Sequence, residues 1–402
     1  MKKFFLFILF ITFFAFCKED FKRGLTVWVS YNDEEFRVFN EIVKEFTKSH
    51  NIKINVQRVP FEGMLEKILT SVIAGQNPDI SRLDIAQVYL LAKKGILAEL
   101  DTNYFVDILK DLYEAPLKSS YYNGKLYGIP DQVTCILLFY NKKLFAEKGL
   151  DSLKPPSTWE EFLEYSKKLT DLKRGIYGFG MRNTLWWDLP FFYTFGSEVF
   201  DKQGNPLFLD EAFKEALIFK RDIYLKHKVE GGAFLEGAVN PDMGFINEKY
   251  AMIFSGPWKI KSLKDINFPF GIALIPKGKA GSFTALGGTQ MVLFKNSKNK
   301  ENAMKFLKYL ISEEIQLKWA KTLGQIPVNK KVVSMIDLKE NKIMETLIKA
   351  IESTKPRAPV AEYPEVERIY IQEISPFIKG EKEIEEVQKN LQDRIKKLLE
   401  GN

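Results

Sequence analysis

Hydrophobic and polar positions switch repeatedly between two spacings along the chain, and this switching predicts strands followed by helices. Residues 25–29 form a short apolar strand, after which Asn32 and Glu35 have the spacing of a helix capping box. Apolar residues three and four apart then give the next segment one hydrophobic helical face. That face consists of Phe36, Phe39, Ile42, Val43 and Phe46. The chain beyond its first residues therefore opens with a strand and a helix.

Later segments repeat this order. Residues 52–56 alternate like a strand, residues 64–73 return to helical spacing, and residues 77–80 lead into another short strand. Gly95 suits the left-handed conformation that ends the following helix. A parallel sheet with crossover helices is the most economical topology for this alternation. Further along, we expect an extended stretch at 127–140, helices at 210–226, 303–311 and 384–399, and a strand pair or extended crossing at 266–275.

The length and composition predict a globular protein of two domains. At 402 residues the chain is too long for one ordinary core. With 46% apolar and 28% charged residues, it is neither disordered nor a bundle of membrane spans. Ser157 and Glu160 cap a fresh helix that starts at Trp159, and the second lobe is expected to begin near there. Trp159 is interpreted as a core anchor of that lobe.

Residues 1–16 predict a signal peptide rather than part of the fold. Two lysines precede an apolar run at 4–16 that is too short to span a bilayer comfortably, and Cys17 with three charged residues follows at once. The chain is therefore expected to be exported. Cys135 lies in an apolar segment and is interpreted as a small buried hydrophobe, with no disulfide framework.

Charge and motif content argue against several classes of function. The net charge of +7 is spread over helix-like faces where Lys alternates with Glu, which is not typical of a nucleic-acid binder. His50 and His227 are the only histidines, so neither a His-based metal cluster nor a Ser-His-Asp arrangement can be assembled. The sequence has no P-loop and no hydrolase nucleophile motif. We expect no cofactor, no metal and no catalytic residues.

Polar and aromatic residues at strand ends point instead to a binding site. Residues 251–254 predict a buried strand that Gly256 and Pro257 end, which leaves Trp258 at its carboxyl end, where open α/β sheets bind ligands. An indole offers a flat apolar face and an N–H donor, which suits a sugar ring, although a tryptophan that only fills a core is the alternative. The other candidates are Tyr31, Asn32, Arg82, Asp84 and Gln132, a loop with Trp186, Trp187 and Asp188, and Gly287, Gly288 and Thr289, where backbone can approach a ligand.

Segments in matching order along almost the whole chain resemble the maltose-binding-protein-like family of extracellular solute-binding proteins of ABC sugar importers. The resemblance runs from about residue 24 to the carboxyl end. It is carried by the segments 78–101, 121–150, 157–162 (STWEEF), 249–258 (KYAMIFSGPW), 270–278 (FGIALIPKG), 297–310 and 324–330 (GQIPVNK).

The resemblance implies a two-lobed periplasmic-binding-protein fold of type II, an α/β architecture in which each lobe is a mostly parallel sheet flanked by helices. The N-terminal lobe would comprise 17–132 and 272–313, and the C-terminal lobe 133–271 and 314–402. A monomer would hold a di- or oligosaccharide in the interlobe cleft and deliver it to ABC permease and ATPase subunits. The leader resembles those of bacterial lipoproteins, although Phe16 stands where they carry a small residue. The resemblance of the leader implies that Cys17 is lipidated and that it anchors the protein in the periplasm or at the outer face of the cytoplasmic membrane.

The same resemblance implies roles for single residues. Trp258 matches a tryptophan that stacks on sugar, and Trp186 falls where the family has an aromatic residue in the second lobe. Arg368 fits a polar contact near the end of the groove. Asn32 corresponds to a polar contact after the first strand, and Asp84 lies where the family commonly places a sugar-binding carboxylate.

Other readings remain open for several of these residues. Asp84 is equally compatible with a helix N-cap, and Arg82 and Asp188 suit surface or interlobe salt bridges. Trp187 is interpreted as packed against its own lobe. A receptor for a phosphorylated polyol, or for an oligosaccharide with acidic groups, would use Arg82 and Arg368 for an anion. A glycoside hydrolase would need two carboxyls facing one bond, and the sequence singles out no such pair.

The residues that differ from the maltose binder bear on the identity of the sugar. Thr134 stands where the maltose binder has a glutamate, and Pro364 stands where it has another stacking tryptophan. The resemblance therefore argues for a sugar other than maltodextrin.

Overall fold

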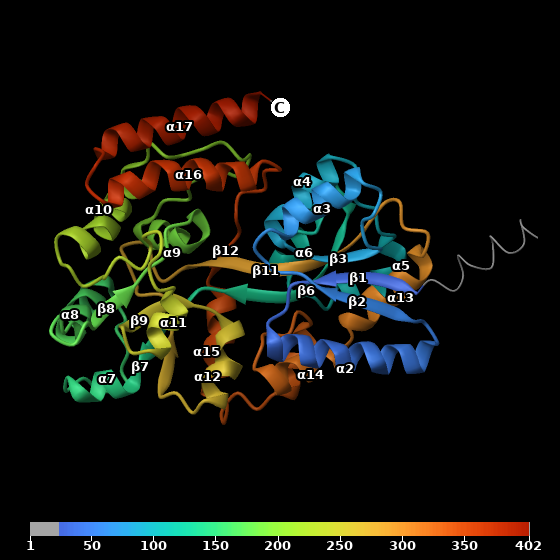
Figure 1. Cartoon of the computed structure of the whole chain (residues 1–402), viewed down its shortest axis with the longest axis horizontal. Coiled ribbons are helices and arrows are strands. Elements are labelled where there is room, and N and C mark those ends of the chain that lie inside the picture. Colours follow the sequence, from blue (N-terminus) through green and yellow to red (C-terminus); the bar gives the residue numbers. More distant parts are fainter. Residues whose placement is uncertain (1–23, 402) are drawn as a thin grey trace, which may run out of the picture.

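Two β-sheets organise the computed structural model of the chain, which describes residues 24–401 (Figure 1). The leader and Cys17 lie outside these residues. The strand order of the first sheet is β12-β11-β3-β1-β2 with β6 beside β11, and that of the second is β10-β7-β9-β8. The first sheet contains β1 (Leu25–Val29), β2 (Ile54–Arg58), β3 (Ile80–Asp84), β6 (Gly128–Cys135), β11 (Thr284–Leu293) and β12 (Thr354–Lys355). The second contains β7 (Leu137–Asn141), β8 (Tyr177–Gly180), β9 (Tyr250–Ser255) and β10 (Phe270–Ala273), and β4 (Tyr121–Tyr122) pairs with β5 (Lys125–Leu126).

The first lobe, by which we mean the elements built on the first sheet, begins with the strands and helices that the pattern predicts. β1 pairs in parallel with both β2 and β3. Helix α2 starts with the predicted capping box of Asn32 and Glu35 and buries its predicted apolar face, including Phe39 and Phe46. The helices of the first lobe are α2 (Asp33–His50), α3 (Met64–Ile73), η1 (Ile85–Gln87), α4 (Val88–Lys93), α5 (Thr102–Leu109), α6 (Glu114–Lys118), α13 (Lys300–Leu310), α14 (Glu313–Leu323) and η3 (Lys330–Met335). Helix α15 (Lys342–Glu352) contacts β6 of the first sheet and β10 of the second.

The second lobe, built on the second sheet, has a core rich in aromatic rings. Trp159 is 3% exposed, lies 4.9 Å from Phe191 between ring centroids, and donates its indole N–H to Thr194 Oγ1 at 2.9 Å. Its predicted role as a core anchor is confirmed. The helices of this lobe are α7 (Lys142–Glu147), α8 (Trp159–Leu169), α9 (Leu185–Phe195), α10 (Glu211–Leu225), α11 (Pro241–Ile246), η2 (Pro257–Lys259), α12 (Ile260–Asp265), α16 (Tyr363–Ile378) and α17 (Ile384–Glu400).

Three segments carry the chain between the two sheets. Ile136 alone separates β6 from β7, residues 274–283 lead from β10 back to β11, and residues 356–362 lead from β12 to α16. The predicted lobe boundaries at 132/133 and 271/272 lie close to the first two crossings. Cys135, at the first crossing, is buried, and this burial raises the pKa of its thiol, as expected for a small hydrophobe in a core.

The third predicted boundary, at 313/314, differs from the structure. It would place α14 in the C-terminal lobe, whereas α14 packs on α2 in the first lobe. Trp319 of α14 lies 5.4 Å from Tyr31 between ring centroids, and Lys318 pairs with Glu45 of α2 at 2.6 Å. The chain therefore leaves the first lobe for the last time after Lys355.

One local prediction was wrong, and another holds only in part. Residues 186–188 belong to helix α9 rather than to a loop. This helix is buried on almost every side and contains Pro190, so it shows neither an amphipathic period nor the usual composition of a helix. Within 266–275 the structure forms a strand only at 270–273. Among the helices of residues 24–401, none is long and apolar enough to span a membrane.

Candidate functional site

Trp258 stands at the carboxyl end of a fully buried strand, as the sequence predicts. All six residues of β9 are buried, and the chain turns into η2 after Gly256. The indole folds back over Gly256 so closely that a Cβ at this position would collide with its six-membered ring. The ring itself is half-buried. A glycine is needed here because it lets the backbone pass beneath the ring.

Two further tryptophans meet Trp258 from helix α9. The Trp258 ring centroid lies 6.1 Å from the Trp186 centroid and 6.1 Å from the Trp187 centroid. The Trp186 and Trp187 rings lie 4.7 Å apart and nearly edge to face. All three side chains are half-buried. We call Trp186, Trp187 and Trp258 the tryptophan cluster.

Trp186 also contacts the first sheet. Its indole Nε1–H donates to the Leu286 carbonyl of β11 at 3.2 Å. A Cβ on Gly287 would lie 2.6 Å from the Trp186 ring, so this glycine provides room for the indole. The neighbouring Gly288 has a φ of 141°, and a Cβ there would collide with the Gln132 carbonyl. The sequence predicts that a ligand can approach the backbone closely at Gly287. In the structure the Trp186 indole makes this close approach.

Asn32 connects the start of α2 with the tryptophan cluster. Its Oδ1 accepts the backbone N–H of Glu35 at 2.9 Å, which is the predicted cap, and its Nδ2 donates to the Trp258 carbonyl at 3.4 Å. The side chain is exposed. Asn32 and Trp258 thus come together from the two lobes.

Asp84, at the end of β3, is both an N-cap and half of an ion pair. Its Oδ1 accepts the N–H of Ala86 in η1 at 2.8 Å. Its carboxylate also pairs with the Arg357 guanidinium at 2.8 Å, and the two side chains are 19% and 8% exposed. Arg357 lies on the third crossing segment, 5.7 Å from the Trp186 ring centroid. Arg357 could not be predicted as a site residue from the sequence. The segment between β12 and α16 has neither a helical nor a strand pattern, and no recognisable motif follows it.

Tyr31 and Gln132 belong to a buried polar network inside the first lobe. The Tyr31 hydroxyl donates to Asp131 at 2.8 Å, and Arg82 Nε donates to the same Asp131 oxygen at 2.9 Å. Gln132 accepts from Arg82 and donates to Glu35 Oε1 at 3.1 Å. Arg82 therefore forms an ion pair, but this pair is buried within one lobe and is neither on the surface nor between the lobes.

Asp188 and Arg368 lie outside the tryptophan cluster. Asp188 is fully buried beneath α9, where it pairs with Lys220 of α10 at 2.5 Å and accepts the Tyr370 hydroxyl at 2.7 Å. Its salt bridge is therefore internal to the second lobe. Burial raises the pKa of Asp188 and lowers that of Lys220. Arg368 lies on the exposed face of α16 and pairs with Glu365.

Trp187 packs within its own lobe, as predicted, and carries a cationic neighbour. The Arg182 guanidinium lies 4.1 Å from the Trp187 ring centroid, with Nη2 2.8 Å from Asp242 and Nη1 2.6 Å from the Phe254 carbonyl. A guanidinium over an indole face is a favourable cation–π contact. The sequence signal for Arg182 was absent because its partners are distant in the chain.

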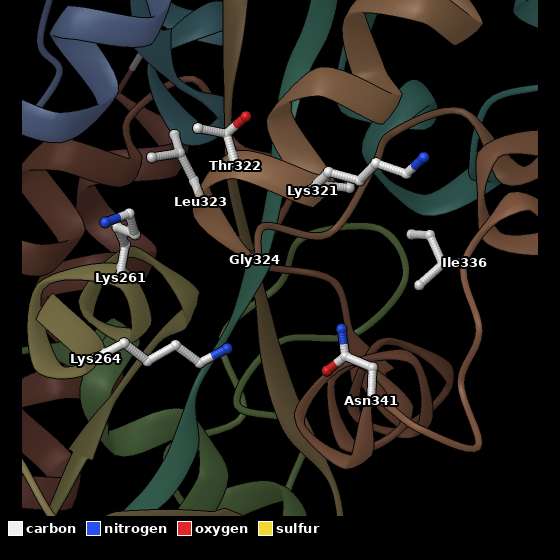
Figure 2. Close-up of a pocket in the computed structure, with 9 residues that line it drawn as sticks. Lys261, Lys264, Lys321, Thr322, Leu323, Gly324, Ile336 and Asn341 are labelled. Atoms are coloured by element: carbon white, nitrogen blue, oxygen red, sulfur yellow. The ribbon is translucent and has the colours of Figure 1, made fainter. Parts of the chain in front are cut away.

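A separate cavity lies where α12 of the second lobe faces the end of α14 in the first lobe (Figure 2). Its volume is about 280 Å³, and Lys261, Lys264, Lys321 and Asn341 contribute polar groups to its lining. No tryptophan lines it. Lysines in the last turns of α12 and α14 also complement the negative ends of these helices. Within residues 24–401, no group of three or more His, Cys, Asp or Glu side chains is arranged to hold a metal ion.

Known proteins match both the sequence and the fold. The family model for bacterial extracellular solute-binding proteins matches residues 41–346. A galactooligosaccharide-binding protein of Bacillus subtilis is 28% identical over 72% of this chain and 69% of its own length. A maltooligosaccharide ABC transporter solute-binding lipoprotein of Streptococcus pneumoniae is 27% identical over 83% of this chain and 79% of its own.

The solved structures agree with this relationship. The crystal structure of an ABC transporter solute-binding protein from Thermotoga lettingae, bound with α-D-tagatose, superposes with a TM-score of 0.87 and 26% identity. The superposition covers 94% of this chain and all of the other. The predicted two-lobed α/β fold is confirmed, but the second sheet is not mostly parallel as expected, because β7 pairs antiparallel with both β9 and β10 and only β8 pairs parallel with β9. Because the family model spans more than half of the chain and the fold agrees, this chain belongs to the bacterial extracellular solute-binding protein family.

Proposed function

We propose that the protein captures a di- or oligosaccharide between its lobes and delivers it to the permease of an ABC importer. The observation that carries this proposal is the tryptophan cluster, in which three half-buried indoles meet beside elements of both lobes. Indole faces bury the apolar face of a sugar ring, and nearby amides and carboxylates hydrogen bond its hydroxyls. Trp258 and Trp186 would provide the stacking surface, and Asn32 and Asp84 the polar edge.

The relatives support the same class of ligand. The Bacillus protein is named for galactooligosaccharides, the Streptococcus protein for maltooligosaccharides, and the Thermotoga protein holds a ketohexose. The positions of Arg82 and Arg368 weaken the alternative of an anionic solute, since both guanidiniums are already paired with carboxylates. We further propose that the protein acts as a monomer and has no catalytic role.

Replacement of Trp258 tests the proposal. A sugar that binds wild-type protein in a calorimetric or thermal-shift screen should bind Trp258→Ala about tenfold more weakly or worse, a loss of about 1.4 kcal/mol. Trp28→Ala is the matched control, because Trp28 is also half-buried but lies on β1 beside Lys67. Equal affinities in wild type and Trp258→Ala would refute the stacking role. Release of products from incubated oligosaccharides would favour a hydrolase instead.

We propose in addition that Cys17 carries a lipid anchor. The support is the leader, in which a short apolar run ends directly at a cysteine, together with the lipoprotein among the relatives. In the native host, the wild-type protein should sediment with membranes, and Cys17→Ser should appear in the soluble extracytoplasmic fraction. A wild-type protein that is soluble, or a variant that stays with the membrane, would contradict the anchor.

A further inference from the structure

We infer that Glu367 and Arg357 are positioning residues that hold the first turn of α9 and thereby orient Trp186 toward the sugar. This inference rests on the proposed function. It starts from the backbone of Trp186, which has little support from its own helix. As a residue of the first turn, Trp186 has no carbonyl four residues earlier in the helix to accept its N–H. Pro190 has no N–H to donate to the Trp186 carbonyl.

The residue that would normally cap this helix does not do so. Thr184 occupies the N-cap position of α9, yet its side chain makes no capping hydrogen bond. The first turn must therefore be stabilised from elsewhere in the molecule, because uncapped N–H groups that are withdrawn from water are unfavourable.

Glu367 of α16 supplies this missing cap. Its Oε1 accepts the backbone N–H of Trp186 at 3.3 Å. A carboxylate at the start of a helix is favoured by the positive end of the helix dipole. Glu367 thus acts on the same turn in two ways, as an acceptor and as a charge.

The charge of Arg357 favours the ionised form of this cap. Burial raises the pKa of Glu367, while the charge of Arg357 opposes that rise and favours the carboxylate. Arg357 is itself fixed by its ion pair with Asp84 at the end of β3, and its guanidinium lies 5.7 Å from the Trp186 ring centroid. A line of charged groups therefore runs from the first sheet, through the third crossing segment, to the helix that carries Trp186.

The rest of α9 is anchored independently of Glu367. Asp188 pairs with the buried Lys220, and the helix ends at Gly196 with a positive φ of 103°. Loss of Glu367 should consequently loosen the turn that contains Trp186 without unfolding the whole helix. This separation makes the positioning role testable.

The test compares Glu367→Ala and Glu367→Gln with wild type. Glu367→Ala removes both acceptor and charge, so it should lower the affinity for a sugar that wild type binds by about tenfold or more. Glu367→Gln keeps an acceptor oxygen but loses the charge, and a neutral hydrogen bond is about half as strong as a charged one. We expect Glu367→Gln to bind about threefold more weakly than wild type. Both variants should alter the tryptophan emission spectrum and near-UV circular dichroism of the sugar-free protein.

Glu373→Ala is the matched control, because Glu373 is a buried, ion-paired carboxylate on the same helix. It pairs with Lys382, just before α17, at 2.7 Å, and with Arg394 of α17. This variant should lower the melting temperature but leave the emission spectrum and the sugar affinity unchanged. Equal spectral and affinity changes in Glu373→Ala and Glu367→Ala would overturn the inference.

Two further results keep the inference separate from the proposed function. If Glu367→Ala does not fold, wild-type affinity and spectra in Glu367→Gln would overturn it. If the wild-type protein binds no sugar, the proposed function fails, but the spectra of the sugar-free variants still decide whether Glu367 orients Trp186.

Discussion

Glu230 is a buried carboxyl of the second lobe, and each hydrogen bond described for its side chain comes from a backbone N–H group. Its oxygens accept the N–H groups of Gly232 at 2.6 Å, Ala233 at 2.8 Å and Met181 at 3.4 Å. Burial raises the pKa of Glu230 to about 7, although these hydrogen bonds oppose the rise. Because the folded-state pKa lies above the unfolded-state value, this group stabilises the fold fully below about pH 4 and loses that contribution as the pH rises through 7.

Glu230→Gln should remove this part of the pH dependence. A shift of this size corresponds to about 3 kcal/mol between pH 4 and pH 8. Urea unfolding at pH 5, 6.5 and 8 would measure it, with the free energy of unfolding falling more steeply with pH in wild type than in Glu230→Gln. Parallel pH profiles for the two proteins would show that Glu230 keeps an ordinary pKa.

Residues whose role is local could be predicted from the sequence, whereas residues whose partners are distant could not. Asn32 and Trp258 were found because a cap and a strand end leave a pattern within a few positions. Arg357 and Glu367 leave none, since Asp84 and Trp186, their partners, are brought close only by the folded chain. Arg368 shows what a resemblance does not provide, because a matching family position does not say which face of α16 the residue occupies.

At the level of elements, helix α2, which buries one face, was predicted, whereas helix α9, which is buried almost entirely, was not. Helix α2 shows a clear apolar stripe and was predicted with its cap. Helix α9 is buried on almost every side and has no polar face, so the sequence shows no helical period there. The sequence predicted neither that residues 313–323 form a helix nor that this helix, α14, belongs to the first lobe. Its packing on α2 depends on Trp319 and Lys318, whose partners are distant in the chain.

At the level of the whole molecule, polar contacts join the first lobe to the third crossing segment and to the second lobe. Asp84 pairs with Arg357 of the third crossing segment, and Lys93 of α4 pairs with Glu362, just before α16, at 2.7 Å. Asn32 adds its hydrogen bond to the Trp258 carbonyl. A sugar shifts the equilibrium between open and closed lobes only through contacts that are more favourable in one of the two states. The polar contacts of Asp84, Lys93 and Asn32 act on the same equilibrium.

Asp84→Asn should therefore open the sugar-free protein. The substitution removes the ion-pair partner of the buried Arg357, which is strongly unfavourable, whereas Lys93→Ala removes a more exposed ion pair that contributes about 0–1 kcal/mol. Small-angle X-ray scattering should show a larger radius of gyration for Asp84→Asn than for wild type, and little change for Lys93→Ala. Far-UV circular dichroism would establish that both variants are folded. A wild-type radius in Asp84→Asn, or an equal increase in Lys93→Ala, would mean that the buried pair does not hold the lobes closed and that Asp84 serves mainly as the cap of η1.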